Sequence, residues 1–345
     1  MSDLIDNNME MHTIRICNED EKDKLIDFIR CCWKEDHILT KSEELLNFQH
    51  LDKVNKIYNF IVAFNNETGA FDAILGFIPL NKYDQNVEND NIWLAVWKVK
   101  KEYANLLIGI KLLLNLTNMY NSSDIGVIGI SDDAMEIYKA FKYKTGSLEH
   151  FIIKNENMEY FHIAKFPSDT TVNTTLKKNN IHLKEISRIE FEKSNLKSGF
   201  KPSKTIQYFV KRYIEHPFYK YRFFGFYLNG EIAGVFISRI ITVDESKCLR
   251  IVDWIGKFPD NVYHQFQELL ANLDCEYVDL LCHVADIQQV LKMGFSLKNE
   301  ADMIIPEYFE PFVRKNTDIR FAYKSNDDHY SFFKGDGDQD RPNII

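Results

Sequence analysis

The sequence lacks the features that mark several classes of protein. Its 345 residues carry 51 acidic and 42 basic side chains, which gives a formal net charge of −9. It therefore lacks the excess of Lys and Arg with which proteins neutralise nucleic-acid phosphates. Its longest apolar run, residues 106–116, is interrupted by Lys111 and is too short to cross a bilayer. We expect a soluble protein that binds neither nucleic acid nor membrane.

Cysteine is scarce and has no pattern. The six cysteines include no Cys-x-x-Cys pair and have no histidine beside them at the spacing of a metal site. They lie among apolar residues, as in Cys31-Cys32-Trp33, which is typical of buried, reduced thiols. The N-terminus also lacks the basic and apolar regions of a signal peptide. These features predict a cytoplasmic protein without a bound metal.

The chain is long enough for two domains, and its pattern of elements repeats. In the first half we expect strands over 13–17, 59–64, 71–80 and 92–99, helices over 19–33, 42–49 and 104–120, a strand over 126–130, a helix over 132–141 and a hairpin over 145–154. In the second half we expect a helix over 205–215, a hairpin over 222–243, strands over 249–255 and 277–284, and helices over 262–273 and 286–293. The dipeptide Asn229-Gly230 predicts a type I′ turn in that hairpin. The division predicts domains over 1–154 and 155–345. The second includes a linker with one candidate strand, 160–166, and ends in an acidic tail.

A motif lies where the first half turns from strand to helix for the last time. The residues from Ser131 onward are similar to the pattern N-x-x-A-x-x-x-Y-x-x-x-G-F of the GNAT N-acetyltransferase superfamily. Ala134 and Tyr138 match, Ser131 stands for the Asn, and Lys142-Tyr143 replaces the Gly-Phe. In the second half Gly294-Phe295 keeps that last pair. Together with the element order, the resemblance implies an α/β (α+β) fold of two tandem GNAT-like domains with mixed sheets.

The resemblance also implies a site for an acyl-CoA co-substrate, most simply acetyl-CoA, in the first domain. In the family a loop of pattern R/Q-x-x-G-x-G/A follows the central strand, and its backbone N–H groups at a helix N-terminus hold the CoA pyrophosphate. The pattern falls on Ala104, Asn105, Leu106, Leu107, Ile108 and Gly109, of which Gly109 matches. The equivalent loop of the second half, residues 256–261, shows no match.

Candidate catalytic groups follow from the same resemblance. The backbone of a bulged central strand, here Val96, Trp97, Lys98 and Val99, would polarise the thioester carbonyl. Tyr138 would protonate the leaving CoA thiolate, or else it packs against the sheet. Asp253 interrupts an apolar strand, where it would orient or deprotonate an amine, or else it faces outward by simple alternation.

The acidic tail, residues 327–342, does not match a calcium loop, and it allows two other interpretations. The alternation of Asp336, Asp338 and Asp340 is that of a calcium loop, but Arg341 replaces the glycine that such a loop requires. The tail resembles the C-termini of acetyltransferases from bacterial surface-polysaccharide gene clusters, which implies a nucleotide-linked amino sugar as acceptor. The alternative is a partly ordered acidic terminus.

Three functions remain open from the sequence. The first is an acetyl-CoA-dependent N-acyltransferase that acts on a small-molecule amine, such as a nucleotide-linked amino sugar. The second is a Fem-type aminoacyl transferase, which is also a tandem GNAT fold but usually has a basic surface. The third is a non-catalytic GNAT-fold pair that is retained for binding.

Overall fold

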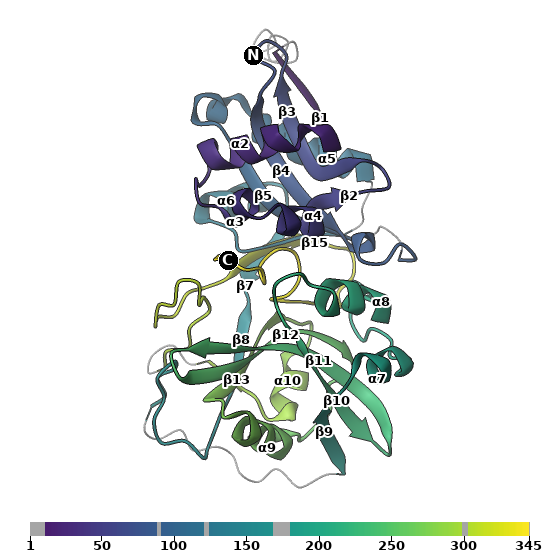
Figure 1. Cartoon of the computed structure of the whole chain (residues 1–345), viewed down its shortest axis with the longest axis vertical. Helices are drawn as coiled ribbons and strands as arrows, with labels where there is room; N and C mark the ends of the chain where they lie inside the picture. The colour runs from purple at the N-terminus through teal and green to yellow at the C-terminus, as the bar shows by residue number, and fades with distance from the viewer. Residues whose placement is uncertain (1–10, 88–90, 121–123, 168–179, 299–302, 345) are drawn as a thin grey trace. The chain divides into compact units, whose positions relative to one another are not determined.

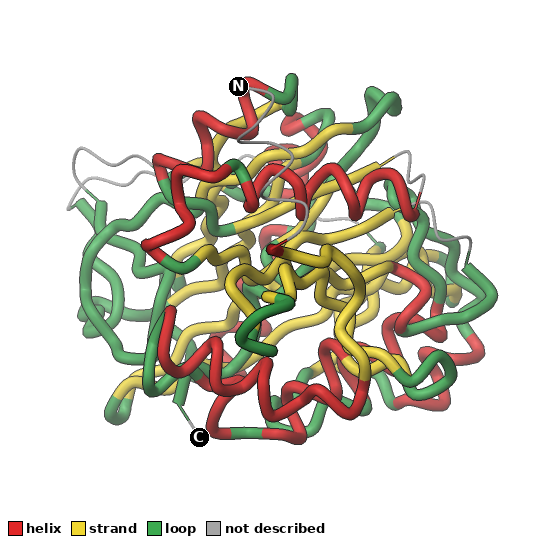
Figure 2. Tube along the Cα trace, turned by 90° about the horizontal axis from the view of Figure 1, so that it is seen from above, coloured by secondary structure: helices red, strands yellow, loops and turns green. Residues whose placement is uncertain are grey.

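The computed structural model describes residues 11–87, 91–120, 124–167, 180–298 and 303–344 (Figure 1). Contacts group the chain into two units, one of Met1–Val127 with Pro342–Ile345 and one of Ile128–Arg341. These units group residues by contact, so they do not test the predicted division after residue 154 into two related domains. Figure 2 shows strands flanked by helices.

The first unit is built on one mixed sheet. Its strands are β1 (His12–Asn18), β2 (Leu51–Asp52), β3 (Ile57–Asn65), β4 (Phe71–Pro79), β5 (Asn91–Val99) and β6 (Asp124–Ile128). The last residue of β6, Ile128, is grouped with the second unit. Within the unit they follow the order β1-β3-β4-β5-β6, and β2 pairs with β3. Strands β5 and β6 are parallel, since a helix connects them, and the other pairs are antiparallel.

Helices cover both faces of this sheet. They are α2 (Lys22–Cys32), α3 (Ile38–Lys41), α4 (Glu43–His50) and α5 (Ile108–Tyr120), with short 3-10 turns at Glu19–Glu21, Leu80–Lys82 and Lys101–Leu106. Asn18 and Glu21 form a capping box at the first turn, and Ser42 caps α4. Every residue of β4 is buried, because α2 lies in front of the sheet and α5 behind it (Figure 1).

The second unit contains a mixed sheet of eight strands. The strands of this unit are β7 (Lys144–Ser147), β8 (Glu149–Lys154), β9 (Ile181–Glu185), β10 (Arg222–Leu228), β11 (Glu231–Val243), β12 (Ser246–Gly256), β13 (Tyr277–His283), β14 (Ser296–Leu297), β15 (Arg320–Lys324) and β16 (Phe332–Phe333), of which β7 and β15 pair with each other outside this sheet. The main sheet has the order β14-β8-β13-β12-β11-β10-β9, with β16 beside β13. The turn between β10 and β11 has positive φ at both Asn229 and Gly230, as the predicted type I′ hairpin requires.

Each face of the second sheet has its own core. The helical elements of the second unit are α6 (Asp132–Ala140), α7 (Arg188–Lys193), α8 (Ile206–Phe209) with a π-helical turn at Val210–Ile214, α9 (Tyr263–Leu273) and α10 (Ile287–Met293). On one face Phe226, Phe236 and Trp254 pack with residues of α9 and α10. On the other face Cys248 and Tyr277 pack with Met303 and Ile305 of an irregular segment. Two mixed sheets with flanking helices confirm the predicted α/β fold class.

The hairpin predicted over 145–154 is wrong. Strand β7 pairs with β15, whereas β8 pairs with β13 and β14. Only Leu148 separates β7 from β8, and a hairpin needs at least two turn residues. The chain therefore continues from one pairing to another without reversing.

The strand predicted over 160–166 is also absent, apart from a single bridge between Lys165 and Ile304. The backbone N–H groups of His162, Ile163 and Ala164 all donate to the buried carboxylate of Glu276. The Glu276 side chain thus accepts the hydrogen bonds that the backbone of a neighbouring strand would accept in a sheet. No helix among the described residues is both long enough and apolar enough to cross a membrane.

Candidate functional site

In the first unit, β5 and β6 separate at one end of the sheet. Their pairing runs from Asn91 opposite Asp124 to Leu94 opposite Val127. Strand β5 then continues to Val99 without this neighbour. We call this the first divergence. Where parallel strands diverge, the backbone N–H and C=O groups on their facing edges have no partner in the adjacent strand. These groups can therefore form hydrogen bonds with an extended ligand.

A bulge lies in β5 at the start of this divergence. Leu75 of β4 is opposite Trp97 and Phe77 is opposite Leu94, so Gly76 faces both Ala95 and Val96. A bulge leaves one residue outside the ladder and redirects its backbone groups. The bulge that the family resemblance implied is therefore present at Val96, whose side chain is fully buried. The use of this backbone as an oxyanion donor stays a prediction.

The chain then turns sharply into α5. The 3-10 turn Lys101–Leu106 ends at Leu107, which has a left-handed φ of 56°, and α5 begins at Ile108. Gly109 packs against β5, because a Cβ there would lie 3.1 Å from Val99 Cγ2 and 3.2 Å from Trp97 Nε1. The helix N-terminus thus lies directly beside the bulged strand. The first backbone N–H groups of a helix, with its dipole, favour an anion at this point.

A buried carboxylate fixes the exit of β5. Asp72 on β4 is 1% exposed and accepts hydrogen bonds from Lys100 Nζ at 2.6 Å, Asn65 Nδ2 at 2.7 Å and, as one tautomer allows, His12 Nε2 at 2.8 Å. Its backbone oxygen also accepts from the Lys100 N–H at 2.9 Å. Burial raises the pKa of Asp72, but the hydrogen bonds from Lys100, Asn65 and His12 outweigh it and hold the pKa below its usual value. Lys100 is thereby committed to Asp72, whereas Lys98 remains half-buried near the divergence.

Sequence reasoning missed Asp72. A lone carboxylate within the apolar strand 71–79 was the available signal. It becomes meaningful only when the fold places it beside the residue that follows β5.

Ser131 and Tyr138 belong to the second unit, on α6. Ser131 is exposed and caps the helix by accepting a hydrogen bond from the Ala134 N–H at 3.3 Å. Tyr138 is 1% exposed, and its ring centroid lies 5.1 Å from that of Tyr143. Burial raises the pKa of the Tyr138 hydroxyl, which makes it a weaker proton donor than an exposed tyrosine. The geometry agrees with packing as well, so the role of Tyr138 stays a prediction.

The second unit contains an equivalent separation between β12 and β13. Their pairing ends at Ile251 opposite Leu280, while β12 continues to Gly256 and β13 to His283. A bulge again marks the point, since Ile237 and Ser238 lie opposite Asp253 and Ile251 and leave Val252 as the extra residue. We call this the second divergence.

Asp253 lies beside this second bulge and is fully buried. Its carboxylate is 2.7 Å and 2.9 Å from Lys204 Nζ and accepts from the Tyr213 hydroxyl at 2.7 Å. It also accepts from the N–H of Trp254 at 2.8 Å. The carboxylate is therefore saturated by protein donors, which is the arrangement of a structural ion pair. Its proposed action on an amine stays untested.

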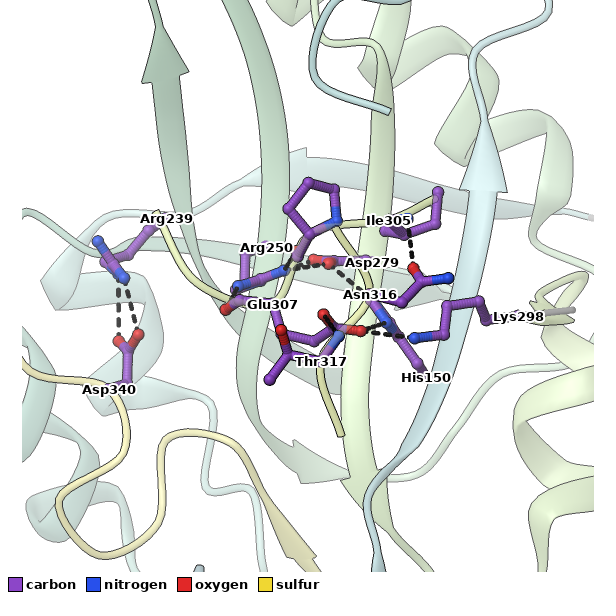
Figure 3. A network of polar contacts seen from close by, with 11 residues as sticks. His150, Arg239, Arg250, Asp279, Lys298, Ile305, Glu307, Asn316, Thr317 and Asp340 are labelled. Carbon is purple, nitrogen blue, oxygen red and sulfur yellow. Dashed lines mark hydrogen bonds and ion pairs between the residues drawn. The ribbon is translucent and has the colours of Figure 1, made fainter. Parts of the chain in front are cut away.

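A buried polar network ties an irregular segment to the second sheet (Figure 3). Arg250 donates to Asp279 at 2.6 Å and to the backbone oxygens of Pro306 and Glu307. His150 bridges Asp279 and Glu307, at 2.9 Å and 3.3 Å. Although burial raises the pKa of Asp279, its contacts with Arg250 and His150 lower it to about 2. These charges are paired within the protein, so we interpret them as structural.

Comparison with known proteins gives structural likeness only. No family model matches the sequence, and no curated protein matches it. A GCN5-related N-acetyltransferase from Anabaena variabilis is 12% identical with a TM-score of 0.54, over 90% of this chain and 72% of that one. A probable N-acyltransferase from Enterococcus faecalis is 10% identical with a TM-score of 0.51, over 90% and 71%.

A third similar structure is a GCN5-related N-acetyltransferase from Kribbella flavida. It is 9% identical with a TM-score of 0.50, over 91% of this chain and 71% of that one. Identities this low show fold and not activity. The likeness nevertheless extends over about nine tenths of the chain, so both units contribute to it. The chain therefore has the fold of the GCN5-related N-acetyltransferases, with two mixed sheets.

Proposed function

We propose that this protein is an acyl-CoA-dependent N-acyltransferase whose acyl-CoA, most simply acetyl-CoA, binds in the first unit at the first divergence. One observation carries the proposal: the strand divergence, the bulge at Val96 and the start of α5 at Ile108 coincide. A thioester with a pyrophosphate needs a carbonyl-polarising group and an anion site, both beside an extended channel. The three features supply these in one place.

Each part of the site has a chemical role in this proposal. The pyrophosphate lies at residues 104–109, where the α5 N-terminus offers backbone N–H groups and Gly109 keeps the helix close to β5. A backbone N–H in the stretch from Val96 to Val99 donates to the thioester oxygen as negative charge develops there. The acceptor amine attacks the carbonyl carbon, the C–S bond breaks, the amine nitrogen loses a proton to solvent water, and the thiolate takes a proton. The family resemblance gives that role to Tyr138, and a Tyr138→Phe variant tests it.

For the acceptor we propose a small-molecule amine. A nucleotide-linked amino sugar is the candidate suggested by the resemblance of the acidic tail. In the structure this tail is mostly buried, with Asp336, Asp338 and Asp340 each paired to a cation. Its acidic residues thus serve packing within the second unit, so a screen of amines is the evidence that decides the acceptor. The free cysteines support the prediction of a reducing, cytoplasmic location.

Binding is tested first, by thermal shift and calorimetry with acetyl-CoA, longer acyl-CoAs and free CoA. A ligand at 100 times its Kd stabilises the folded state by about 2.7 kcal/mol, which is a readily measured shift in Tm. Gly109→Leu forces α5 away from β5 and should abolish the shift. Leu114→Ala changes an exposed residue of the same helix, 45% exposed, and should leave the shift intact.

Turnover then separates the three functions. Release of CoA thiol with an amine panel supports the acyltransferase. Binding without release for any amine supports the non-catalytic GNAT-fold protein. A Fem-type aminoacyl transferase predicts no acetyl-CoA binding and activity with aminoacyl-tRNA, which the net charge of −9 disfavours.

A further inference from the structure

The second divergence is filled by the chain itself. Strand β16 pairs with β13 beyond the point where β12 leaves it, with Phe333 opposite Cys282 and Phe332 opposite His283. The next residues bridge both strands: the Lys334 N–H donates to the Leu281 oxygen at 2.9 Å and the Gly335 N–H to the Val252 oxygen at 2.8 Å. The backbone carbonyl of the second bulge is thus bound to residue 335.

We propose that residues 331–340, the C-terminal segment, are a built-in ligand of the second divergence, so that the chain binds one acyl-CoA, and not two. This inference rests on the proposed function for the first unit. There the corresponding space between β5 and β6 would receive the extended part of acyl-CoA. In the second unit a peptide backbone already makes the hydrogen bonds that such a ligand would need.

A buried ion cluster holds the segment in place. Lys204 is 5% exposed and its Nζ lies 2.8 Å from Asp336 and 2.7 Å from Asp253. Burial lowers the pKa of Lys204, but Asp253 and Asp336 outweigh it and raise the pKa above its usual value. The cation is therefore shared between a residue of β12 and a residue of the segment. An acyl-CoA entering here would displace Asp336 and leave the buried Lys204 with one carboxylate partner, Asp253, in place of two, which is unfavourable.

The fit of Gly335 excludes a larger residue. A Cβ at this position would lie 2.4 Å from the Tyr213 hydroxyl and 2.6 Å from the Val252 oxygen. The fully buried Arg212 donates to the backbone oxygens of Gly335 and Gly337, at 3.2 Å and 3.3 Å. Close packing and a dedicated cation on the backbone indicate a site built for this segment.

The far end of the segment is anchored as firmly. Asp340 accepts two hydrogen bonds from Arg239, at 2.8 Å and 3.1 Å, which Figure 3 shows, and one from the Tyr221 hydroxyl at 2.7 Å. Near the start of the segment, before Asp336, Lys334 is 3% exposed and its Nζ lies 5.0 Å from the centroid of the Tyr308 ring. Displacing the segment would require both ion pairs to open.

The experiment uses the full chain and acetyl-CoA as the probe. Calorimetry gives the stoichiometry, and hydrogen exchange read by mass spectrometry follows the segment with and without saturating acetyl-CoA. The amides of residues 333–336 each donate a hydrogen bond, to Asp336 Oδ2, Leu281, Val252 and Phe333 respectively. We expect a stoichiometry of one and slow exchange of these amides that acetyl-CoA leaves unchanged.

A stoichiometry of two, or faster exchange of the segment on adding acetyl-CoA, would overturn the inference. A stoichiometry of zero contradicts the proposed function of the first unit instead. In that case fast exchange of amides 333–336 in the ligand-free chain rejects the built-in ligand, and slow exchange supports it.

A pair of variants checks that the ion cluster is responsible. Asp336→Asn weakens the contact with Lys204 and should speed exchange of amides 333–336 by roughly 10- to 100-fold. Asp338→Asn is the matched control, because the ion pair of Asp338 is local, with Arg341 three positions on. It should change that exchange by less than about threefold. Equal effects of the two variants would count against the cluster as the anchor.

Discussion

Asparagine in place of Asp72 tests how the exit of β5 positions the turn into α5. The change keeps the shape of the side chain and removes its charge. Asp72 accepts from Lys100, Asn65 and His12, all within 2.8 Å, and is 1% exposed. A hydrogen bond to a charged group contributes about 1.5–3 kcal/mol, and an amide can keep only part of this set. We expect a loss of about 3 kcal/mol in the free energy of unfolding.

That loss corresponds to a fall in Tm of roughly 10 °C for a unit of this size. The sign of its pH dependence follows from the lowered pKa of Asp72. A carboxyl whose folded pKa is depressed contributes stability above its unfolded pKa of about 3.9, and loses it as the pH falls through the folded value. The difference between wild type and variant should therefore be present at neutral pH and shrink below about pH 4.

The functional effect should appear in acyl-CoA binding. Freeing Lys100 from Asp72 loosens residues 101–107, so KM for acetyl-CoA should rise by about tenfold, or about 1.4 kcal/mol, with kcat little changed. Glu21→Gln is the control. It weakens the ion pair between Arg15 on β1 and Glu21 in the 3-10 turn Glu19–Glu21, whose two N–O distances are 2.6 Å and 2.7 Å. If Asp72→Asn lowers Tm but leaves KM at the control's value, Asp72 is structural and the reasoning about positioning is refuted.

Three further substitutions test separate parts of the account. Tyr138→Phe should lower kcat by about 10²–10⁴-fold with unchanged acyl-CoA affinity if the hydroxyl protonates the thiolate; normal turnover with a lower Tm would return Tyr138 to the core. Arg250→Met leaves Asp279 buried beside His150 alone and should cost about 3–5 kcal/mol by urea unfolding; a loss below about 1 kcal/mol would contradict the paired network. Gly109→Leu should cost about 1–3 kcal/mol from overpacking against β5, beyond its effect on acyl-CoA binding; an unchanged urea midpoint would show that the helix tolerates the bulk.

Local signals in the sequence predicted most of the elements. The apolar run at 92–99 became β5, and Asn229-Gly230 became the expected turn, because positive φ at two successive residues favours that dipeptide. The bulge at Val96 has no side-chain signature, since it consists of one backbone residue outside the ladder. Only the resemblance to a family implied it.

The acidic tail shows what the sequence could not reveal. Read locally, Asp336, Asp338 and Asp340 indicated a charged and partly ordered terminus. In the structure Asp336 pairs with Lys204, which is 132 positions away in the chain, and Asp340 pairs with Arg239, 101 positions away. A charge pattern carries no information about partners at such separations, so burial of these carboxylates could be found only from the fold.

The strands of the second sheet are synthesised in an order that leaves part of this sheet unpaired during translation. Strands β12 and β13 are complete by His283, but the residues that bridge them begin at Phe332, roughly 50 residues later. At about 5–20 residues per second, a ribosome leaves two facing strand edges without their partner for about 3–10 s. Open edges of this kind are templates for pairing with other chains. Expression at lower temperature slows translation and lengthens this interval. We therefore expect aggregation of the nascent chain to depend strongly on the supply of chaperones, even if the finished protein is stable.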